Sequence, residues 1–252
     1  MEKYELPLVF FTVLSQMSVG MALVLTWRTL RGEVEGQRFY WLATGLVLAL
    51  ASIAAILHLA HPDRAYDALI NLRHAWLSRE ILGATLFGAA VGVTFLAKGH
   101  KAMTLIASVF GVLLVAVQGM TYAAPAMVAI ANGFTMLLFF ITVWVMGCAA
   151  IKLRPAVPAL RQGIVACIAV LIAAPLVWLS GGTVMQMTAH SWLASPFYLA
   201  SLVCLALAFV ASRHGDSRPK RLFVLLFVGV FLSRLVFFGD TVSTIVNIGH
   251  LY

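Results

Sequence analysis

Apolar stretches about 20 residues long follow one another along this chain, separated by short polar links. A stretch of that length lets an α-helix cross a bilayer core about 30 Å thick. A helix also satisfies its own backbone hydrogen bonds, which lipid cannot do. The short alternating segments typical of a membrane β-barrel are not seen. The pattern therefore predicts an all-α integral membrane protein.

The composition excludes a soluble domain. Of the 252 residues, 62% are hydrophobic and 10% are charged, whereas soluble domains carry about 25% charged residues. The net charge is +8, but the basic residues lie in the short links between apolar stretches rather than among aromatic residues. We therefore expect contact with membrane lipid and no nucleic-acid partner.

Eight transmembrane helices are predicted, in one domain that spans residues 1–252. The predicted ranges are 7–27, 39–60, 80–97, 102–122, 127–151, 162–180, 192–212 and 221–239. The link between the fourth and fifth helices is only 123–126, where Pro125 is the break signal. The long polar connection is 61–79. Trp41, Trp178 and Trp192 are expected at the membrane interfaces.

The distribution of Lys and Arg predicts the orientation. The links after the first, third, fifth and seventh helices carry 12 of the 17 basic residues, the opposite face carries 4, and Arg234 lies inside the last helix. Basic links stay on the cytoplasmic side. Both termini and the 61–79 connection are therefore expected on the periplasmic side of a bacterial cytoplasmic (inner) membrane.

Neither the cysteines nor the histidines predict a metal site. Cys148, Cys167 and Cys204 fall inside apolar stretches without paired spacing, so we expect small buried side chains and no iron–sulfur cluster or molybdenum in this chain. A haem held by two histidines needs both to face each other from helices. Of the seven histidines, only His58 lies in a predicted apolar helix, and no haem is expected.

Three ionisable residues interrupt apolar helices: His58, Glu80 and Arg234. Such residues are costly in lipid and usually face a bundle interior or a cavity. His58 and Glu80 lie at the same outer end of consecutive helices, so the two are expected to approach each other. A histidine and a carboxylate suit quinol oxidation, because quinol hydroxyls must be hydrogen-bonded and must lose protons. No role follows for Arg234.

Simpler explanations remain open for each residue. His58 fits an interfacial histidine bonded to a backbone carbonyl, and Glu80 fits a residue that interacts with a helix dipole. Arg64 and Arg79 fit solvated side chains. Residue by residue, the pattern does not establish a site.

One block of the sequence resembles the membrane anchor subunits of bacterial dimethyl sulfoxide reductases. Residues 58–66 read His-Leu-Ala-His-Pro-Asp-Arg-Ala-Tyr, and residues 76–81 read Trp-Leu-Ser-Arg-Glu-Ile. The family carries His-Leu-Gly-x-Pro-x-Arg-Ala followed by Leu-Ser-x-Glu-Ile, so Ala60 stands where glycine is usual. Residues 6–16 are similar to the family's first helix and residues 233–239 to its last. The middle helices match in hydropathy and length.

The resemblance implies eight helices with periplasmic termini, no haem, and menaquinol bound near the periplasmic face. The family's histidine and glutamate, which take part in quinol oxidation, correspond to His58 and Glu80. We expect Arg64, Ser78 and Arg79 to complete the quinol site. The two arginines would keep Glu80 ionised or shape the entrance.

The resemblance also implies partners and a pathway of anaerobic respiration. Electrons would pass to a four-cluster iron–sulfur subunit and then to a molybdopterin catalytic subunit, with docking near 61–79 and 181–191. Two alternatives stay open. A secondary transporter would carry broken helices near the midplane, whereas polarity here concentrates at one face. A purely structural anchor would be expected to lack His58 and Glu80.

The orientation is testable with reporter fusions. Fusions in the links after the first, third, fifth and seventh predicted helices should show cytoplasmic reporter activity, because those links hold most of the Lys and Arg residues. A fusion at Tyr252 should show periplasmic activity. Cytoplasmic activity at Tyr252 would contradict the predicted orientation.

Overall fold

The computed structural model describes residues 4–33, 37–58, 72–151, 157–213 and 219–244, and the regular elements in these ranges are all helices. They are α1 (Leu6–Leu30), α2 (Gln37–His58), α3 (Trp76–Leu96), α4 (Lys101–Tyr122), α5 (Gly133–Ile151), α6 (Val157–Leu179), α7 (Thr183–Ala194), α8 (Pro196–Arg213) and α9 (Pro219–Gly239). Eight of them, all except α7, are long and apolar enough to cross a membrane. The prediction of an all-α membrane protein with eight spans is confirmed.

The helix predicted over 192–212 is wrong at its start, because the structure divides this region in two. Ser195 has an extended backbone (φ −75°, ψ 125°) and separates α7 from α8. A residue before proline is pushed out of the helical region, and Pro196 follows Ser195. At 1.5 Å per residue, the 12 residues of α7 extend about 18 Å, which is too short to cross a bilayer.

Three other helix starts differ from the prediction by four residues or more. The sixth helix begins at Val157 rather than at 162. The third helix begins at Trp76 rather than at residue 80, so Glu80 lies one turn inside it. The fifth begins at Gly133 rather than at 127, after a series of turns. The side chain of Asn132 accepts a hydrogen bond from the backbone N–H of Phe134 (2.9 Å) and thereby stabilises the start of α5.

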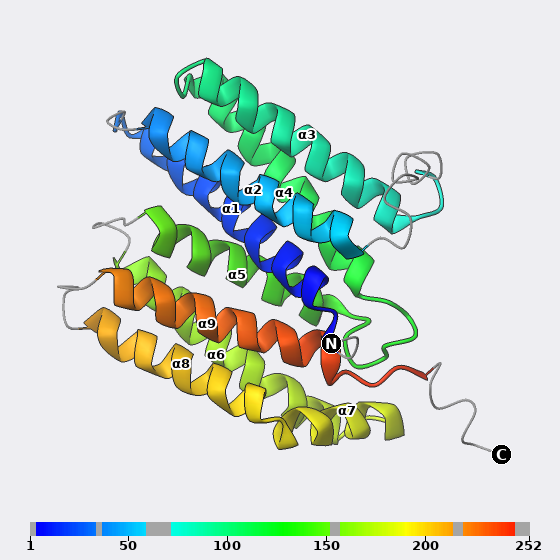
Figure 1. Cartoon of the computed structure of the whole chain (residues 1–252). Coiled ribbons are helices and arrows are strands. Elements are labelled where there is room, and N and C mark those ends of the chain that lie inside the picture. The colour runs from blue at the N-terminus through cyan, green and yellow to red at the C-terminus, as the bar shows by residue number, and fades with distance from the viewer. Residues whose placement is uncertain (1–3, 34–36, 59–71, 152–156, 214–218, 245–252) are drawn as a thin grey trace.

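Helix α1 lies in the middle of the bundle. It packs against α2, α4, α5 and α9, between a group formed by α2, α3 and α4 and a group formed by α5, α6, α8 and α9 (Figure 1). Its span is 78% buried, against 22% for α2 and 28% for α3. Polar side chains on α1 therefore face other helices rather than lipid.

The contact between α1 and α5 is made by two glycines. A Cβ at Gly20 would overlap the carbonyl oxygen of Val143 and lie 2.8 Å from the Cα of Gly147. A Cβ at Gly147 would in turn overlap the backbone of Gly20. Small residues let membrane helices approach closely where lipid supplies no hydrophobic force between them. The two backbones are in direct contact at this point.

The tryptophans expected at the interfaces are buried instead. Trp41, Trp178 and Trp192 are at most 2% exposed. The rings of Trp178 and Trp192 meet edge to face at 4.9 Å, and Phe134 packs against both. This cluster ties α7 to α6 and α5, so these rings pack inside the bundle rather than on its surface.

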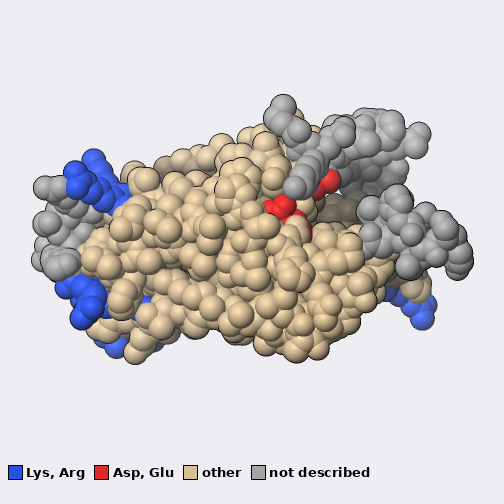
Figure 2. Space-filling model, turned by 90° about the horizontal axis from the view of Figure 1, so that it is seen from below, with Lys and Arg blue, Asp and Glu red and all other residues tan. Residues whose placement is uncertain are grey.

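Basic side chains gather at one end of the bundle, where α1 ends and α9 begins (Figure 2). The described basic residues of the links at this end are Arg28, Arg31, Arg38, Lys98, Lys101, Arg161, Arg213, Lys220 and Arg221. Arg73 and Arg79 lie at the other end, where α1 begins and α9 ends. This asymmetry is the one on which the predicted orientation depends, and the orientation itself stays a prediction.

The glycine contact predicts a difference between two alanine substitutions. Gly20→Ala should destabilise the protein by about 1–3 kcal/mol, because the added methyl group meets backbone atoms that cannot move aside. Gly92→Ala is the matched control, since a Cβ at Gly92 meets no atom within 4 Å. The measurement is the midpoint of thermal unfolding in detergent. Equal midpoints for the two variants would show that the α1–α5 contact is not tight.

Candidate functional site

Glu80 is the ionisable residue of the predicted quinol site whose side chain the structure describes as buried. It lies on α3 and is 1% exposed. Its neighbours on α4 are the polar side chains of Gln118, Thr121 and Tyr122. Their positions fall short of hydrogen-bond geometry, and neither carboxyl oxygen has a partner among the described residues. A buried carboxyl group without partners is costly and needs an explanation.

The sequence of α3 explains why this carboxyl group is buried. Glu80 shares one face of the helix with Phe87, Val91 and Thr94, which are also buried. This spacing follows the helical period, so the face that packs on α4 carries a carboxyl group near the start of α3. At Gly83 a Cβ would lie 3.5 Å from the Cα of Leu114. The small residue thus keeps α3 close to α4 one turn beyond Glu80.

A chain of buried polar side chains runs from α4 to α9. Gln118 donates a hydrogen bond to the hydroxyl of Ser15 (2.9 Å), and Gln16 donates a long one to Gln118 (3.5 Å). Arg234 donates to the side-chain oxygen of Gln16 (2.9 Å) and to Thr142 (2.8 Å). All five side chains are at most 1% exposed. With Glu80, this polar chain joins α3, α4, α1, α9 and α5.

Arg234 is the cation at the inner end of the polar chain. It is fully buried, and its guanidinium lies over the ring of Phe139 at 4.3 Å, with Phe237 at 5.8 Å. Its Nε and Nη1 atoms have no hydrogen-bond partner among the described residues. The aromatic faces and the two hydrogen bonds of Nη2 therefore stabilise a charge that the bilayer would otherwise exclude.

The other predicted site residues have different placements. His58 is the last residue of α2, and its side chain lies outside the described part of the structure, as does all of Arg64. Ser78 is buried on α3, two residues before Glu80. Arg79 donates to the backbone oxygens of Leu72 and Arg73 (2.9 and 2.7 Å) and lies over the ring of Trp76 at 4.3 Å.

The approach of His58 to Glu80 therefore stays a prediction. The described contacts of Arg79 are made with the segment that leads into α3, so they give no support to an ion pair with Glu80. They instead fix the start of α3, the helix that carries Glu80. In this position Arg79 can shape the surface at the end of the bundle beside Glu80.

Sequence reasoning missed the glutamines of the polar chain. No sequence motif marks Gln118, and Gln16 stands out only as part of residues 6–16, which resemble the family's first helix. The available signal was a polar amide in the middle of an apolar helix, which usually finds a partner inside the bundle. Thr142 gave no such signal, because Thr side chains in helices commonly bond to their own backbone, as Thr142 does to Leu138.

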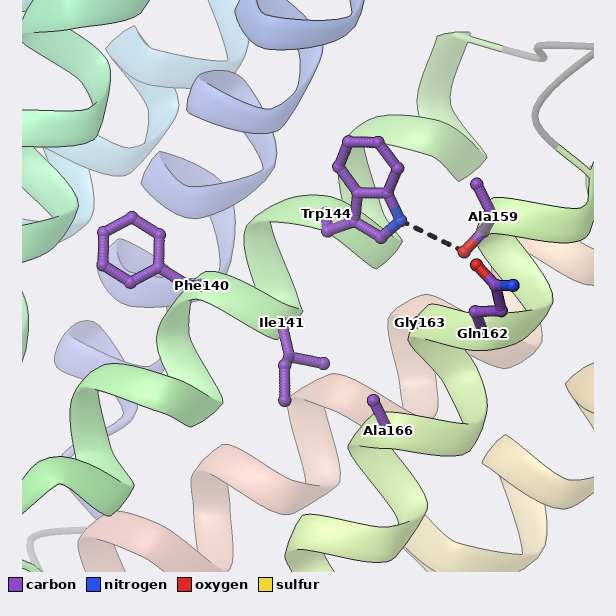
Figure 3. Close-up of a pocket in the computed structure, with 7 residues that line it drawn as sticks. All are labelled: Phe140, Ile141, Trp144, Ala159, Gln162, Gly163 and Ala166. Atoms are coloured by element: carbon purple, nitrogen blue, oxygen red, sulfur yellow. Dashed lines mark hydrogen bonds between the residues drawn. The ribbon is translucent and has the colours of Figure 1, made fainter.

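A groove of about 400 Å³ lies between α5 and α6 (Figure 3). The indole N–H of Trp144 donates to the backbone oxygen of Ala159 across it (3.1 Å). The lining is apolar apart from Trp144 and Gln162. None of the predicted quinol-site residues lines this groove, so it is not the site that the sequence predicted.

In the described part of the protein, no group of three or more His, Cys, Asp or Glu side chains is placed to hold a metal ion. His74, His100 and His190 are exposed there, and His190 lies on α7 rather than in a link. The side chains of the three cysteines are free thiols.

These features define a multi-pass membrane protein whose bundle encloses a carboxyl group near one end and a guanidinium deeper inside. Residues 1–193, which are more than half of the chain, match the family of DMSO reductase anchor subunits (DmsC), and the chain belongs to that family. This confirms the family suggested by the sequence block 58–81. Membership and the eight apolar spans support the expected location in the bacterial inner membrane.

Three relatives, all named as chains of anaerobic dimethyl sulfoxide reductases, show how far the similarity extends. The protein is 32% identical over 160 residues to YnfH of Escherichia coli K12, with 57% of this chain and 55% of the relative covered. It is 32% identical over 152 residues to a relative from Haemophilus influenzae, with 56% and 54% covered. With a second relative from Escherichia coli K12 it is 26% identical over 277 residues, with 94% of both covered. The first two alignments thus span about half the length of those relatives.

Proposed function

We propose that this chain is the menaquinol-oxidising membrane anchor of an anaerobic dimethyl sulfoxide reductase-type complex. The observation that carries the proposal is the Glu80 carboxyl group, which is buried between the outer ends of α3 and α4 without a hydrogen-bond partner among the described residues. Membership of the anchor family supplies the class of complex. A quinol hydroxyl is the kind of donor that such a carboxyl group lacks.

The chemistry assigned to the site is proton removal. Oxidation of one quinol releases two electrons and two protons and leaves the quinone. Glu80 and His58 are the groups proposed to act here: one accepts a hydrogen bond from a quinol hydroxyl, and the other takes its proton. The tyrosine and amide side chains of α4 beside Glu80 form the polar wall of this site.

Ser78, Arg79 and Arg64 complete the proposed quinol site. Ser78 is buried two residues from Glu80 on the same helix and offers a hydroxyl group. Arg79 holds the start of α3 through the Leu72 and Arg73 carbonyls, which keeps Glu80 at a fixed depth. Arg64 is included only because the sequence block 58–66 resembles the family.

The electrons require partner subunits. We propose an iron–sulfur subunit that accepts them and a molybdopterin subunit that reduces the terminal acceptor, because the described residues offer no metal cluster of their own. The proposed docking surface is the periplasmic face near 61–79 and 181–191. Helix α7 belongs to this surface, where Gln186 and His190 are exposed. Protons and electrons would then leave on the same side, and turnover would move no net charge across the membrane.

Removing the two acceptor groups separately tests the quinol site. In the assembled complex, His58→Ala and Glu80→Gln should each lower quinol oxidation by about 100-fold or more, the usual effect of losing a general base. Electron supply from an artificial dye directly to the partner subunits should stay at the wild-type rate. Quinol oxidation at the wild-type rate in both variants would mean that the site lies elsewhere, as a structural anchor or a transporter requires.

The partner requirement has its own test. Membranes that contain this chain without the other subunits should bind menaquinol but transfer no electrons to an acceptor. The described residues include no group of side chains placed to hold a metal cluster that could carry electrons. Co-expression with the iron–sulfur and molybdopterin subunits should restore quinol-dependent reduction. An active quinol-dependent reductase purified from this chain alone would contradict the proposal.

A further inference from the structure

The buried polar chain has a fixed direction, because one of its ends can only donate hydrogen bonds. A guanidinium has five N–H donors and no acceptor. Arg234 donates from Nη2 to the side chain of Gln16, so the atom of Gln16 that faces Arg234 must be the amide oxygen (2.9 Å). The NH₂ group of Gln16 then points the other way, toward α4.

The same reasoning passes from Gln16 to Gln118. The NH₂ group of Gln16 can only donate, so it meets the amide oxygen of Gln118 (3.5 Å). The NH₂ group of Gln118 is left to face outward, where one of its N–H bonds goes to the hydroxyl of Ser15 (2.9 Å). Gln118 also neighbours Glu80, although the two fall short of hydrogen-bond geometry, and its second N–H is the donor that it can turn to the carboxyl group.

Arg234 therefore lies at one end of a chain of oriented amides whose other end lies beside Glu80. We propose that Arg234 is a positioning residue which, through the fixed amides of Gln16 and Gln118, directs an N–H group at Glu80 and keeps that carboxyl group a hydrogen-bond acceptor. An ionised carboxyl group only accepts, and it matches this N–H. A protonated one accepts the N–H more weakly, through its carbonyl oxygen alone, so an N–H held toward Glu80 favours the ionised form. The amides cannot flip while Arg234 holds Gln16.

The burial of Arg234 supports this role. A buried cation is costly unless nearby groups stabilise its charge. The described ion pairs include none with Arg234. The rings of Phe139 and Phe237 exclude water from one side of the guanidinium. In such an environment hydrogen bonds in a chain strengthen one another, so a charge at one end can hold the amides along it.

This inference rests on the proposed quinol function and names a further residue of that site. For quinol oxidation, Glu80 must be free to accept a proton each time a quinol arrives. An amide pair held in one orientation favours the ionised carboxyl group between reaction cycles, because an N–H bonds more strongly to a carboxylate. The contribution of Arg234 is then to the rate of the reaction rather than to quinol binding.

The test breaks the polar chain at Gln16, which touches neither Glu80 nor the proposed quinol position. Gln16→Met keeps the size of the side chain and removes both hydrogen bonds. Gln162→Met is the matched control, since Gln162 lies on α6 at the groove of Figure 3. Arg234→Gln is the second variant, and it removes the charge itself. All are measured in the assembled complex.

Two readouts are expected to change together. The infrared carboxyl band of Glu80, identified by its loss in Glu80→Gln, should shift in Gln16→Met and in Arg234→Gln but not in Gln162→Met. The kcat for quinol oxidation should fall about 10-fold in the first two variants, which is less than the loss of a general base itself. The KM for quinol and the dye-driven activity should stay unchanged.

Other results would overturn the inference. An unshifted Glu80 band in Gln16→Met would show that the amides of the polar chain do not act on the carboxyl group. Equal loss of quinol and dye activities would assign Gln16 and Arg234 a structural role only. If the band shifts while quinol oxidation is unchanged, the link exists but Glu80 does not serve the reaction, and the proposed function itself fails.

Discussion

The direct backbone contact between α1 and α5 is the interaction on which the rest of the bundle depends. Gly20 and Gly147 allow this approach because neither has a Cβ. Gln16 lies one turn from Gly20, and Thr142 lies close to Gly147 on α5. Both reach Arg234 of α9 as a result. A wider spacing would leave the guanidinium without these acceptors inside the membrane, where water cannot replace them.

The spans could be predicted from the sequence because a bilayer fixes the length of a helix that crosses it. The predictions that were wrong lie where turns or side-chain packing, rather than bilayer thickness, determine the structure. Helix α7 was missed since its apolar residues continue into α8, and only the extended Ser195 before Pro196 separates them. The start of α5 was placed too early because a run of turns over 125–132 is as apolar as a helix. Trp192 was assigned to an interface, but an aromatic cluster buries it.

The candidate site could be predicted only in part. Glu80 was identified because an acidic residue within an apolar helix is costly and therefore informative. The hydrogen bonds of the polar chain were beyond prediction, because they join residues 102 and 218 positions apart. A single sequence gives no sign of which helices are neighbours. The meeting of His58 with Glu80 stays a prediction, since the side chain of His58 lies outside the described residues.

The central position of α1 has a consequence for biosynthesis. Helix α1 leaves the ribosome long before α9, so Gln16 enters the membrane while the arginine that it will bind is still unmade. An arginine inside an apolar helix costs up to about 2.5–3.5 kcal/mol on insertion, and Arg234 lies five residues before the end of α9. The amide oxygen of Gln16 is then a ready acceptor for the incoming α9. Until α9 packs against α1, the amide of Gln16 lacks the guanidinium partner that it has in the closed bundle.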